Sequence, residues 1–312
     1  MPTNIFQMII TLNEKEERKA DKSLYSYQKG AISKIFDSFE NSREDYHLLY
    51  QLPTGGGKTV IFSEIVRQYL SNHNKKVLVM THRIELCKQT SKVLSEFGVE
   101  NKVIDSKANL DDQSMYTCFV AMVETLNNRL NDDKLDISGI GLVIIDEAHY
   151  NSFTKLFKFF SNSFILGVTA TPLSSNIELP MTDNYDELIV GESIQDLIKN
   201  EFLASANMYS FNVGLTSLVI GANGDYTVKS SEDLYTNNDM LSKLLVSYEE
   251  KCKDQKTLIF NNGINTSLIV YDMFKTAGYD VAHLDNTASK KERARILNWF
   301  KVTPGAILTS VS

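Results

Sequence analysis

Short apolar runs recur along the first 200 residues, and each ends abruptly in a polar turn rich in Gly, Thr or Asp. Amphipathic stretches lie between them; residues 57–70, for example, place Ile61 and Ile65 at helical spacing. Near-continuous apolar strands that alternate with helices are buried on both faces, which is typical of a parallel α/β sheet. The predicted strands of this series are residues 47–52, 76–80, 118–122, 141–145 and 164–168.

A second series of the same kind begins near residue 200, which predicts two α/β domains, 1–200 and 201–312, each with a parallel sheet. The Gly-, Asn- and Ser-rich stretch 214–238 is expected to be an insertion in the second domain. That domain is short for a doubly wound fold and stops directly after a strand, so we expect it to be incomplete. Its predicted strands are 207–213, 256–260, 280–284 and 306–310, and its predicted helices are 239–252, 265–277 and 288–300.

Composition places these 312 residues among ordinary folded proteins, with 43% hydrophobic and 23% charged residues. No apolar run approaches the roughly 20 residues that a membrane-spanning helix needs, so we expect no membrane partner. The three cysteines are scattered, odd in number and without a CxxC pair. This argues against a disulfide framework or a zinc site and favours a reducing, cytoplasmic location.

The net charge of −7 and the pI near 5.4 give the chain as a whole no attraction for nucleic acid. Any contact with nucleic acid must therefore come from a local basic or dipolar groove.

A glycine-rich segment, Leu52-Pro-Thr-Gly-Gly-Gly-Lys58-Thr59, follows the first predicted strand and opens a helix. This is the context that a phosphate-binding loop requires, because glycines let backbone N–H groups and the helix N-terminus face a phosphate. The lysine can reach the β- and γ-phosphates of a nucleotide, and the threonine hydroxyl can bind Mg²⁺. A plain glycine-rich turn is the alternative. The predicted nucleotide-binding residues here are Thr54, Gly55, Gly56, Gly57, Lys58 and Thr59.

An acidic pair, Asp146 and Glu147, ends the predicted strand 141–145 and is followed by Ala148 and His149. Carboxylates at the end of a buried strand are costly unless they serve a cation or a proton transfer, although an acidic surface turn is the alternative. We expect Asp146 to hold Mg²⁺ and Glu147 to orient an attacking water. Both motifs follow strands of one sheet, whose carboxyl ends are where such sheets bind ligands.

The phosphate loop, the Asp-Glu-Ala-His motif and Thr169-Ala-Thr171-Pro, in this order, resemble a superfamily 2 DEAH-type helicase. The similarity is to the branch that includes type I and type III restriction-enzyme motor subunits and related DNA repair helicases, and it extends from about Leu24 to Ser312. It implies two RecA-like domains, ATP and Mg²⁺ as cofactors, ATP hydrolysis between the domains, and a nucleic-acid strand across both. A phosphate loop that has Leu52 in place of the first glycine is usual in that family.

The resemblance assigns further roles by position. Gln28, between Tyr25 and Ala31, matches the segment that recognises adenine, and an amide can indeed pair with the N6/N7 edge of that base. The alternative is an ordinary helix start. His149, Thr169 and Thr171 match residues that couple hydrolysis to strand movement.

The residues expected from this resemblance to contact nucleic acid are Thr81, His82, Arg83, Thr125, Asn261 and Thr309. For the turn 81–83 the alternative is a helix N-cap by Thr81 beside a solvated Arg83. The family's sixth motif, whose arginines act on the γ-phosphate, does not occur in the 312 residues. We therefore expect ATP binding to be retained and turnover to be affected.

Together these features predict an ATP- and Mg²⁺-dependent motor on nucleic acid, with DNA favoured over RNA and a nuclease or other subunits as partners. One alternative is a nucleotide-switched binding module with little turnover, because the arginine motif is missing. The other is a phosphate-loop ATPase that acts on proteins or small molecules. The Thr169–Pro172 segment and the turn 81–83 argue against the latter.

Overall fold

The computed structural model describes residues 23–43, 45–105, 115–131, 139–174, 178–211, 214–221, 224 and 226–311. The chain divides into two compact units, Met1–Ala206 and Asn207–Ser312, and each is described by itself. The sequence placed its domain boundary at residues 200 and 201. No described helix has both the length and the apolar character needed to cross a membrane.

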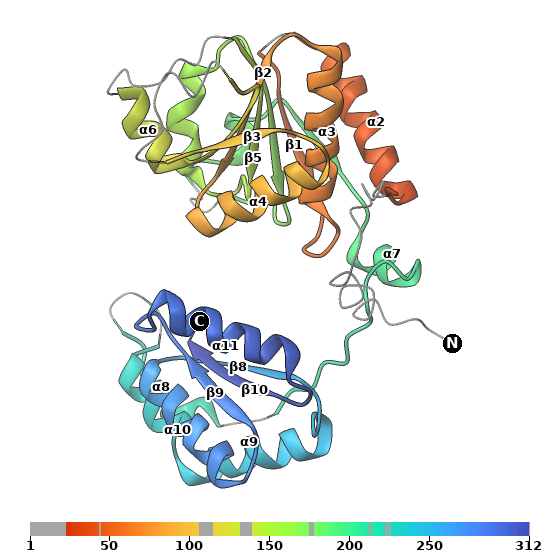
Figure 1. The fold of residues 1–312 in the computed structure, drawn as a ribbon. Coiled ribbons are helices and arrows are strands. Elements are labelled where there is room, and N and C mark those ends of the chain that lie inside the picture. The colour runs from red at the N-terminus through yellow and green to blue at the C-terminus, as the bar shows by residue number, and fades with distance from the viewer. Residues whose placement is uncertain are drawn as a thin grey trace. The chain divides into compact units, whose positions relative to one another are not determined.

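The first unit is built on a seven-stranded sheet whose order is β3-β4-β2-β5-β6-β1-β7, and every strand pair in it is parallel (Figure 1). The strands are β1 (His47–Gln51), β2 (Lys76–Thr81), β3 (Asn101–Ile104), β4 (Cys118–Met122), β5 (Ile140–Asp146), β6 (Phe164–Thr169) and β7 (Glu187–Val190). The helices are α2 (Ser26–Glu40), α3 (Lys58–Asn72), α4 (Ile84–Glu96), α6 (Val123–Asn131) and α7 (Ile194–Lys199), with 3₁₀ turns η2 (Asn151–Phe159) and η3 (Met181–Asp183).

Both faces of this sheet are covered, which explains why its central strands are almost continuously apolar. Successive side chains of a strand point to opposite faces. One set therefore packs with α2, α3 and α4, and the other packs with α6 and η2 (Figure 1). The first set includes Leu48, Tyr50, Val77, Val79, Val120, Leu142, Ile144, Leu166 and Val168, and the second includes Leu49, Leu78, Met80, Ala121, Val143, Ile145 and Ile165.

The second unit has a three-stranded parallel sheet of order β8-β10-β9. Its helices α9 and α10 pack on one face and α11 packs on the other (Figure 1). Its strands are β8 (Thr257–Asn261), β9 (Val281–Leu284) and β10 (Ile307–Val311). Its helices are α8 (Val228–Tyr235), α9 (Asn238–Lys251), α10 (Ile264–Thr276) and α11 (Lys290–Val302), with a 3₁₀ turn η4 (Leu215–Ser217).

Three helices of the second unit begin at side-chain caps that the sequence supplies. The side chains of Thr227, Asn237 and Ser289 each accept a hydrogen bond from the backbone N–H three residues later. Such caps satisfy one of the free N–H groups at a helix start. They explain why α8, α9 and α11 start where they do.

The predicted α/β class with two parallel sheets is confirmed, whereas the strand predicted at 207–213 is wrong. Residues 207–211 form no regular structure, and 212 and 213 lie outside the described residues. The side chains of Met208, Tyr209 and Phe211 are 94%, 56% and 52% exposed. Their apolar character therefore reflects neither a sheet position nor core packing.

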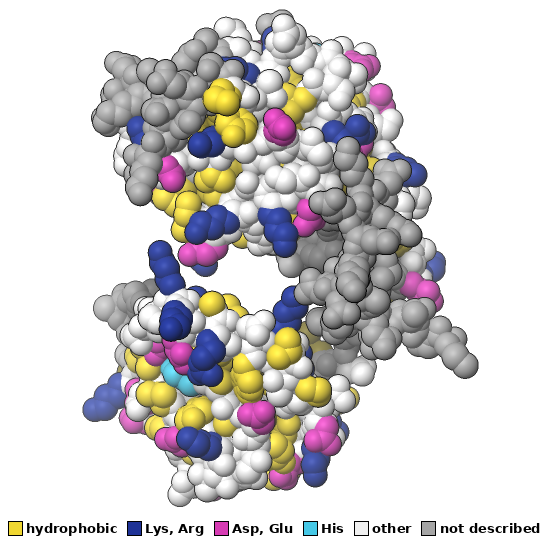
Figure 2. All heavy atoms as spheres, viewed as in Figure 1, with side chains coloured by type: hydrophobic (Ala, Val, Ile, Leu, Met, Phe, Trp, Pro, Cys, Tyr) yellow, Lys and Arg dark blue, Asp and Glu magenta, His cyan; other side chains and the backbone are white. Residues whose placement is uncertain are grey.

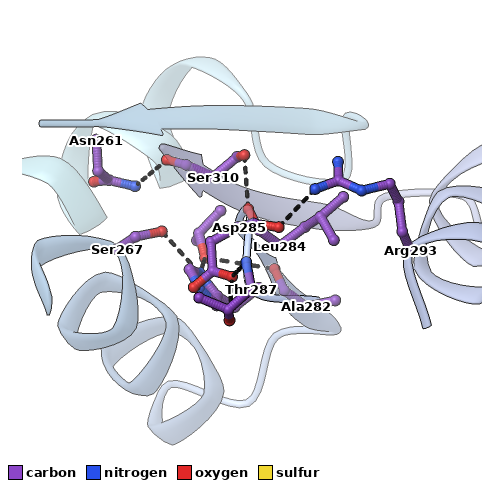
Figure 3. A network of polar contacts seen from close by, with 10 residues as sticks. Asn261, Ser267, Ala282, Leu284, Asp285, Thr287, Arg293 and Ser310 are labelled. Carbon is purple, nitrogen blue, oxygen red and sulfur yellow. Dashed lines mark hydrogen bonds and ion pairs between the residues drawn. The ribbon is translucent and has the colours of Figure 1, made fainter. Parts of the chain in front are cut away.

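A partly buried polar network joins the strands of the second unit near their carboxyl ends (Figure 3). The His283 ring has Nδ1 2.9 Å from Ser267 Oγ and 3.3 Å from Thr309 Oγ1, and its Nε2 lies 3.2 Å from Asp285 Oδ2. Ser267 is fully buried on α10, so this Ser-His-Asp arrangement offers no nucleophile to a substrate. Its role is to tie β9 to α10 and β10.

Asp285 is the acidic anchor of this network. It accepts hydrogen bonds from the Thr287 N–H at 2.8 Å and the Thr287 hydroxyl at 2.7 Å, and Arg293 donates to its carbonyl oxygen at 2.7 Å (Figure 3). The hydrogen bonds from Thr287 and His283 lower the pKa of the Asp285 carboxyl to about 2. Because the carboxylate is favoured in the folded state, its contribution to stability is present above the unfolded pKa near 4 and is lost toward pH 2.

We expect Asp285→Asn to loosen the second unit at pH 7, because it removes a charged acceptor of three hydrogen bonds. Amide hydrogen exchange of β9 and β10 in the full chain should be faster by roughly tenfold at pH 7. The difference between variant and wild type should shrink at pH 3. Asp272→Asn, on the exposed side of α10, is the matched control. An equal effect of Asp285→Asn at both pH values would contradict the ionic role.

Candidate active site

The sheet order brings the three predicted ATP-site motifs to one edge. Strands β5, β6 and β1 are neighbours, with Asp146 opposite Val168 and Gln51 opposite Thr169. The Leu52 N–H donates to the Thr169 carbonyl at 2.9 Å. The loop after β1, the acidic end of β5 and the threonine that ends β6 are therefore adjacent, as parallel pairing requires.

The loop between β1 and α3 has a backbone that only glycine adopts easily. Gly55 and Gly57 have φ angles of 85° and 84°, in the left-handed region, and α3 starts directly after Gly57. A Cβ atom at Gly56 would lie 2.7 Å from Leu52 Cγ, and one at Gly57 would lie 2.7 Å from Gln28 Nε2. Leu52 is fully buried beneath the loop, which explains an apolar residue at that position.

Lys58 lies at the first turn of α3, with only 8% of its surface exposed. Its Nζ donates to the Leu52 carbonyl at 3.3 Å and lies 4.0 Å from Glu147 Oε1. The ammonium group and the positive end of α3 thus act on the same loop, which is the electrostatic arrangement that binds phosphate.

Asp146 is 7% exposed at the end of β5, and burial together with the neighbouring Glu147 raises the pKa of its carboxyl to about 6, although Lys58 opposes the shift. The Glu147 N–H donates to Asp146 Oδ1 at 3.1 Å. Glu147 itself has a φ of 55°, a left-handed conformation that is unusual for a residue with a side chain. Such strain is common at functional sites.

The Asp146 carboxylate and the Thr59 hydroxyl are the donors available for a magnesium ion here. Thr59 follows Lys58 in α3, and its side-chain hydroxyl makes no hydrogen bond within the part of the chain that the structure describes. One carboxylate and one hydroxyl fit Mg²⁺, which commonly takes its remaining ligands from water and substrate phosphates. The donor set therefore fits the ion that the sequence predicted.

His149 connects the acidic motif to β6. Its Nδ1 lies 3.0 Å from Thr169 Oγ1 and 3.5 Å from Glu147 Oε2. The Thr169 hydroxyl donates to the Thr171 carbonyl at 3.0 Å and accepts from the Thr171 N–H at 3.1 Å. Because the threonine proton is used in this way, Nδ1 of His149 is the donor to Thr169. The three predicted coupling residues are thus in direct contact.

Gln28 lies beside the phosphate loop, 4% exposed. Its Oε1 accepts from the Tyr25 N–H at 3.0 Å, and its Nε2 donates to the Tyr27 hydroxyl at 3.4 Å. The Tyr27 hydroxyl in turn donates to the Gly56 carbonyl at 2.7 Å. The Gln28 amide is therefore already bonded within the chain, and it would exchange these bonds to recognise a base.

Phe202 is a part of this region that sequence reasoning missed. Its ring packs against Tyr25 at 4.7 Å and Tyr27 at 4.9 Å between centroids. It follows α7 by three residues and belongs to no recognised motif, so only the fold reveals it. A cavity of about 800 Å³ lies beside these rings, and the side chains that line it include Tyr27, Lys34, Tyr50, Glu192, Asn200 and Phe202.

The turn predicted to contact nucleic acid follows β2. Thr81 is fully buried, and its hydroxyl donates to the Arg83 carbonyl at 3.1 Å and lies 2.9 Å from Cys87 Sγ. The N-cap of α4 is Arg83, so the alternative in which Thr81 caps this helix is wrong. Arg83 is exposed and has no ion pair within the described residues, whereas the Nδ1 atom of His82 is buried without a partner.

The remaining predicted contacts lie on other elements. Thr125 is half-buried in the first turn of α6. In the second unit, Asn261 ends β8 and donates to the Ser310 carbonyl at 3.2 Å. Thr309 is fully buried in the middle of β10, within the network of His283, so its side chain does not reach the surface of the sheet in this arrangement.

The side chains on one face of the molecule show how charge is distributed there. On the face of the described residues shown in Figure 2, Lys and Arg side chains are interspersed with Asp and Glu over both units. This agrees with the net charge of −7. Attraction of a phosphate backbone must therefore arise locally, from residues such as Arg83 and from helix N-termini.

We expect Asp146→Asn to stabilise the nucleotide-free protein at pH 7.5. A carboxyl whose folded pKa is raised from 3.8 to about 6 costs stability once both states are ionised, by up to roughly 3 kcal/mol at 1.4 kcal/mol per pKa unit. The cost falls as the pH drops below 6, is small near pH 4, and vanishes below the unfolded pKa of 3.8, where both states hold the proton. Thermal unfolding of the full chain at both pH values measures this, with Asp37→Asn on the exposed side of α2 as control. A variant that is less stable than wild type at pH 7.5 would show that burial is not the main effect on the free energy of the Asp146 carboxylate.

Known proteins that are similar to this chain include one protein family and several relatives. Residues 21–174 match the family model described as type III restriction enzyme, res subunit. The chain is 26% identical over 257 residues to a 51.5 kDa protein of a Lactococcus phage, covering 81% of this chain and 52% of that protein. It is 27% identical over 301 residues to the putative ATP-dependent helicase IRC3 of Saccharomyces cerevisiae, covering 89% of this chain and 42% of that protein.

The fold is also similar to that of the Pyrococcus furiosus Hef helicase domain, with a TM-score of 0.54 at 14% identity, covering 92% of this chain and 85% of that one. The two sheets are thus RecA-like, as predicted. The chain spans about half the length of the curated relatives it matches. With its motifs assembled at one sheet edge and residues 21–174 matching the restriction-subunit family, the chain belongs with the superfamily 2 helicases of the restriction and repair branch.

Proposed function

We propose that this chain hydrolyses ATP at the edge of the first sheet and uses the reaction to move along nucleic acid. The observation that carries the proposal is the placement of Lys58 within 4.0 Å of Glu147, next to the buried Asp146, at the start of a helix. A cation, a candidate water-orienting carboxylate and a candidate magnesium ligand then converge where a γ-phosphate would lie.

In this mechanism the N–H groups of Thr54 to Thr59 hold the phosphates, and Lys58 neutralises charge on the β- and γ-phosphate oxygens. Thr59 and Asp146 would hold Mg²⁺, which would supply further positive charge to the phosphates. Glu147 orients a water in line with the γ-phosphorus. The water oxygen forms the new P–O bond, the bond to the β–γ bridging oxygen breaks, and ADP and phosphate leave.

Recognition of the nucleotide base is assigned to Gln28, beside Tyr25 and Phe202. The Gln28 amide contacts the loop that holds the phosphates, since Nε2 sits directly against Gly57. Bidentate pairing of the amide with an adenine edge would favour ATP over other nucleotides.

The coupling of hydrolysis to strand movement is assigned to the contacts of His149 with Thr169 and of Thr169 with Thr171. His149 in turn lies 3.5 Å from Glu147, the residue that orients the water. The strand contacts are assigned to Thr81, His82, Arg83, Thr125, Asn261 and Thr309, with the buried threonines contributing through their backbone. Phosphate contacts of this kind give little sequence specificity and strong salt dependence.

The match to a restriction-enzyme subunit supports DNA over RNA as the track, and supports a nuclease or another subunit as partner. Two of the three cysteines, Cys87 and Cys118, are buried free thiols, which supports a reducing, cytoplasmic compartment.

The test is steady-state ATPase activity with no nucleic acid, single-stranded DNA, duplex DNA or RNA. We expect DNA to stimulate turnover and Lys58→Ala to reduce it by about 10²-fold or more, because the main cation on the phosphates is lost. Lys92→Ala, on the exposed side of α4, is the matched control and should leave turnover unchanged.

Other outcomes of the same assay separate the alternatives. ATPase activity that is indifferent to every nucleic acid would favour an ATPase acting on proteins or small molecules. Binding of ATP and DNA without turnover would favour a nucleotide-switched binding module.

A further inference from the structure

Three aromatic rings form a continuous stack between the acidic motif and the turn after β2. Tyr150 lies between His82 and His149, with centroid distances of 4.3 Å to each and interplanar angles of 37° and 36°. We name these three side chains the ring stack. The distances are at the short end for aromatic pairs, so the rings are in direct contact.

The sheet explains why residues so far apart in sequence meet. Strands β2 and β5 are neighbours, with Met80 opposite Ile145, so the chain leaves both strands at the same level. His82 is two residues past Met80. The turn after β5 folds back through a hydrogen bond from the Tyr150 N–H to the Glu147 carbonyl at 3.2 Å.

The composition of the ring stack is not that of ordinary core packing. The Tyr150 side chain is 36% exposed, so burial alone provides only part of its stabilisation. His82 has its Nδ1 buried without a partner, and burial together with Arg83 lowers the pKa of His82. A buried imidazole nitrogen without a hydrogen bond costs free energy, so the position of His82 against Tyr150 calls for an explanation other than core packing.

One end of the ring stack reaches the proposed hydrolysis site. His149 lies 3.5 Å from the Glu147 carboxylate, which is 4.0 Å from Lys58. Glu147 also has the left-handed φ of 55°, which a residue with a side chain adopts only when its surroundings hold it there. The other end of the ring stack is the turn that carries Arg83, the exposed cation proposed to contact a strand.

We propose that Tyr150 is a positioning residue that couples strand binding at the turn 81–83 to the orientation of Glu147 through the ring stack. The inference rests on the proposed function and adds to it a specific set of contacts that links the strand-binding turn to the hydrolysis site. A strand that shifts His82 displaces the Tyr150 ring, and this displacement changes how His149 holds Glu147. The coupling is reciprocal, so a nucleotide at Glu147 changes the affinity of the turn for a strand.

The experiment measures that reciprocity as binding, without turnover. The affinity of the full chain for a fluorescein-labelled single-stranded DNA is determined with and without a non-hydrolysable ATP analogue and Mg²⁺, and RNA of the same sequence is run in parallel. For wild type we expect the two affinities to differ by a factor within the 5–150-fold range usual for coupled sites.

Tyr150→Leu, which keeps apolar volume but removes the ring, should bring this factor to within about twofold of one. The nucleotide-free affinity for DNA and the DNA-free affinity for the analogue should each change by less than about twofold. Tyr150→Phe keeps the ring and should retain the wild-type factor. Tyr116→Leu, a half-buried tyrosine of the same unit outside the site, is the matched control and should retain it too. If Tyr150→Leu fails to fold, Tyr150→Met, which also removes the ring and keeps apolar volume, replaces it, with Tyr150→Phe again as the ring-preserving variant.

A wild-type factor that survives in Tyr150→Leu would overturn the inference and leave the proposed function intact. Loss of the factor in Tyr150→Phe as well would also overturn it, because the ring would then not be what couples the sites. A chain that binds ATP and DNA independently would do the same. A wild-type chain that binds neither ATP nor nucleic acid would reject the proposed function, and the inference with it.

Discussion

Parallel pairing of β5, β6 and β1 is the constraint on which the rest of the site depends. Because all three strands end at one edge, Lys58, Asp146, Glu147 and Thr169 meet although together they span more than one hundred residues of sequence. The pairing is in turn secured by apolar side chains on both faces of the sheet, which explains why such polar groups can be held in fixed positions at the end of a fully buried core. The positive φ angles of the loop glycines and of Glu147 are local backbone features at the ends of these strands.

Much of this arrangement could be predicted from sequence, because its signals are local. Every apolar run predicted in the first unit became a central strand, and the motifs follow those strands at the expected places. The edge strands β3 and β7 were missed, since neither is a continuous apolar run. Only Ile104 of β3 is buried, and Leu188 and Val190 of β7 are 47% and 60% exposed. The strand prediction for 207–211 was wrong for the opposite reason, because this segment is apolar in sequence but pairs with no strand among the described residues.

Contacts between distant segments had no signal in the sequence. Phe202 belongs to no motif, and its packing against Tyr25 and Tyr27 depends on where the chain returns after α7. His82 was predicted from its position, but its contact with Tyr150 requires the register of β2 with β5. His283 has no metal-ligand spacing, and its polar partners, Ser267 and Asp285, are brought to it by the fold of the second unit.

The two sheets treat an aspartate at a strand's carboxyl end in opposite ways. Asp285 follows β9 and is given three hydrogen bonds from Thr287 and His283, which lower the pKa of its carboxyl to about 2. Asp146 ends β5 and, among the described residues, accepts one hydrogen bond, from the Glu147 N–H. Burial and the neighbouring Glu147 raise the pKa of its carboxyl to about 6, although Lys58 opposes the shift. A carboxylate whose hydrogen bonds are already made stabilises the fold. A buried carboxylate with few partners destabilises the fold but is available to a cation. The same topology therefore yields a structural anchor in one unit and a candidate reaction centre in the other, and burial together with the number of local donors decides which.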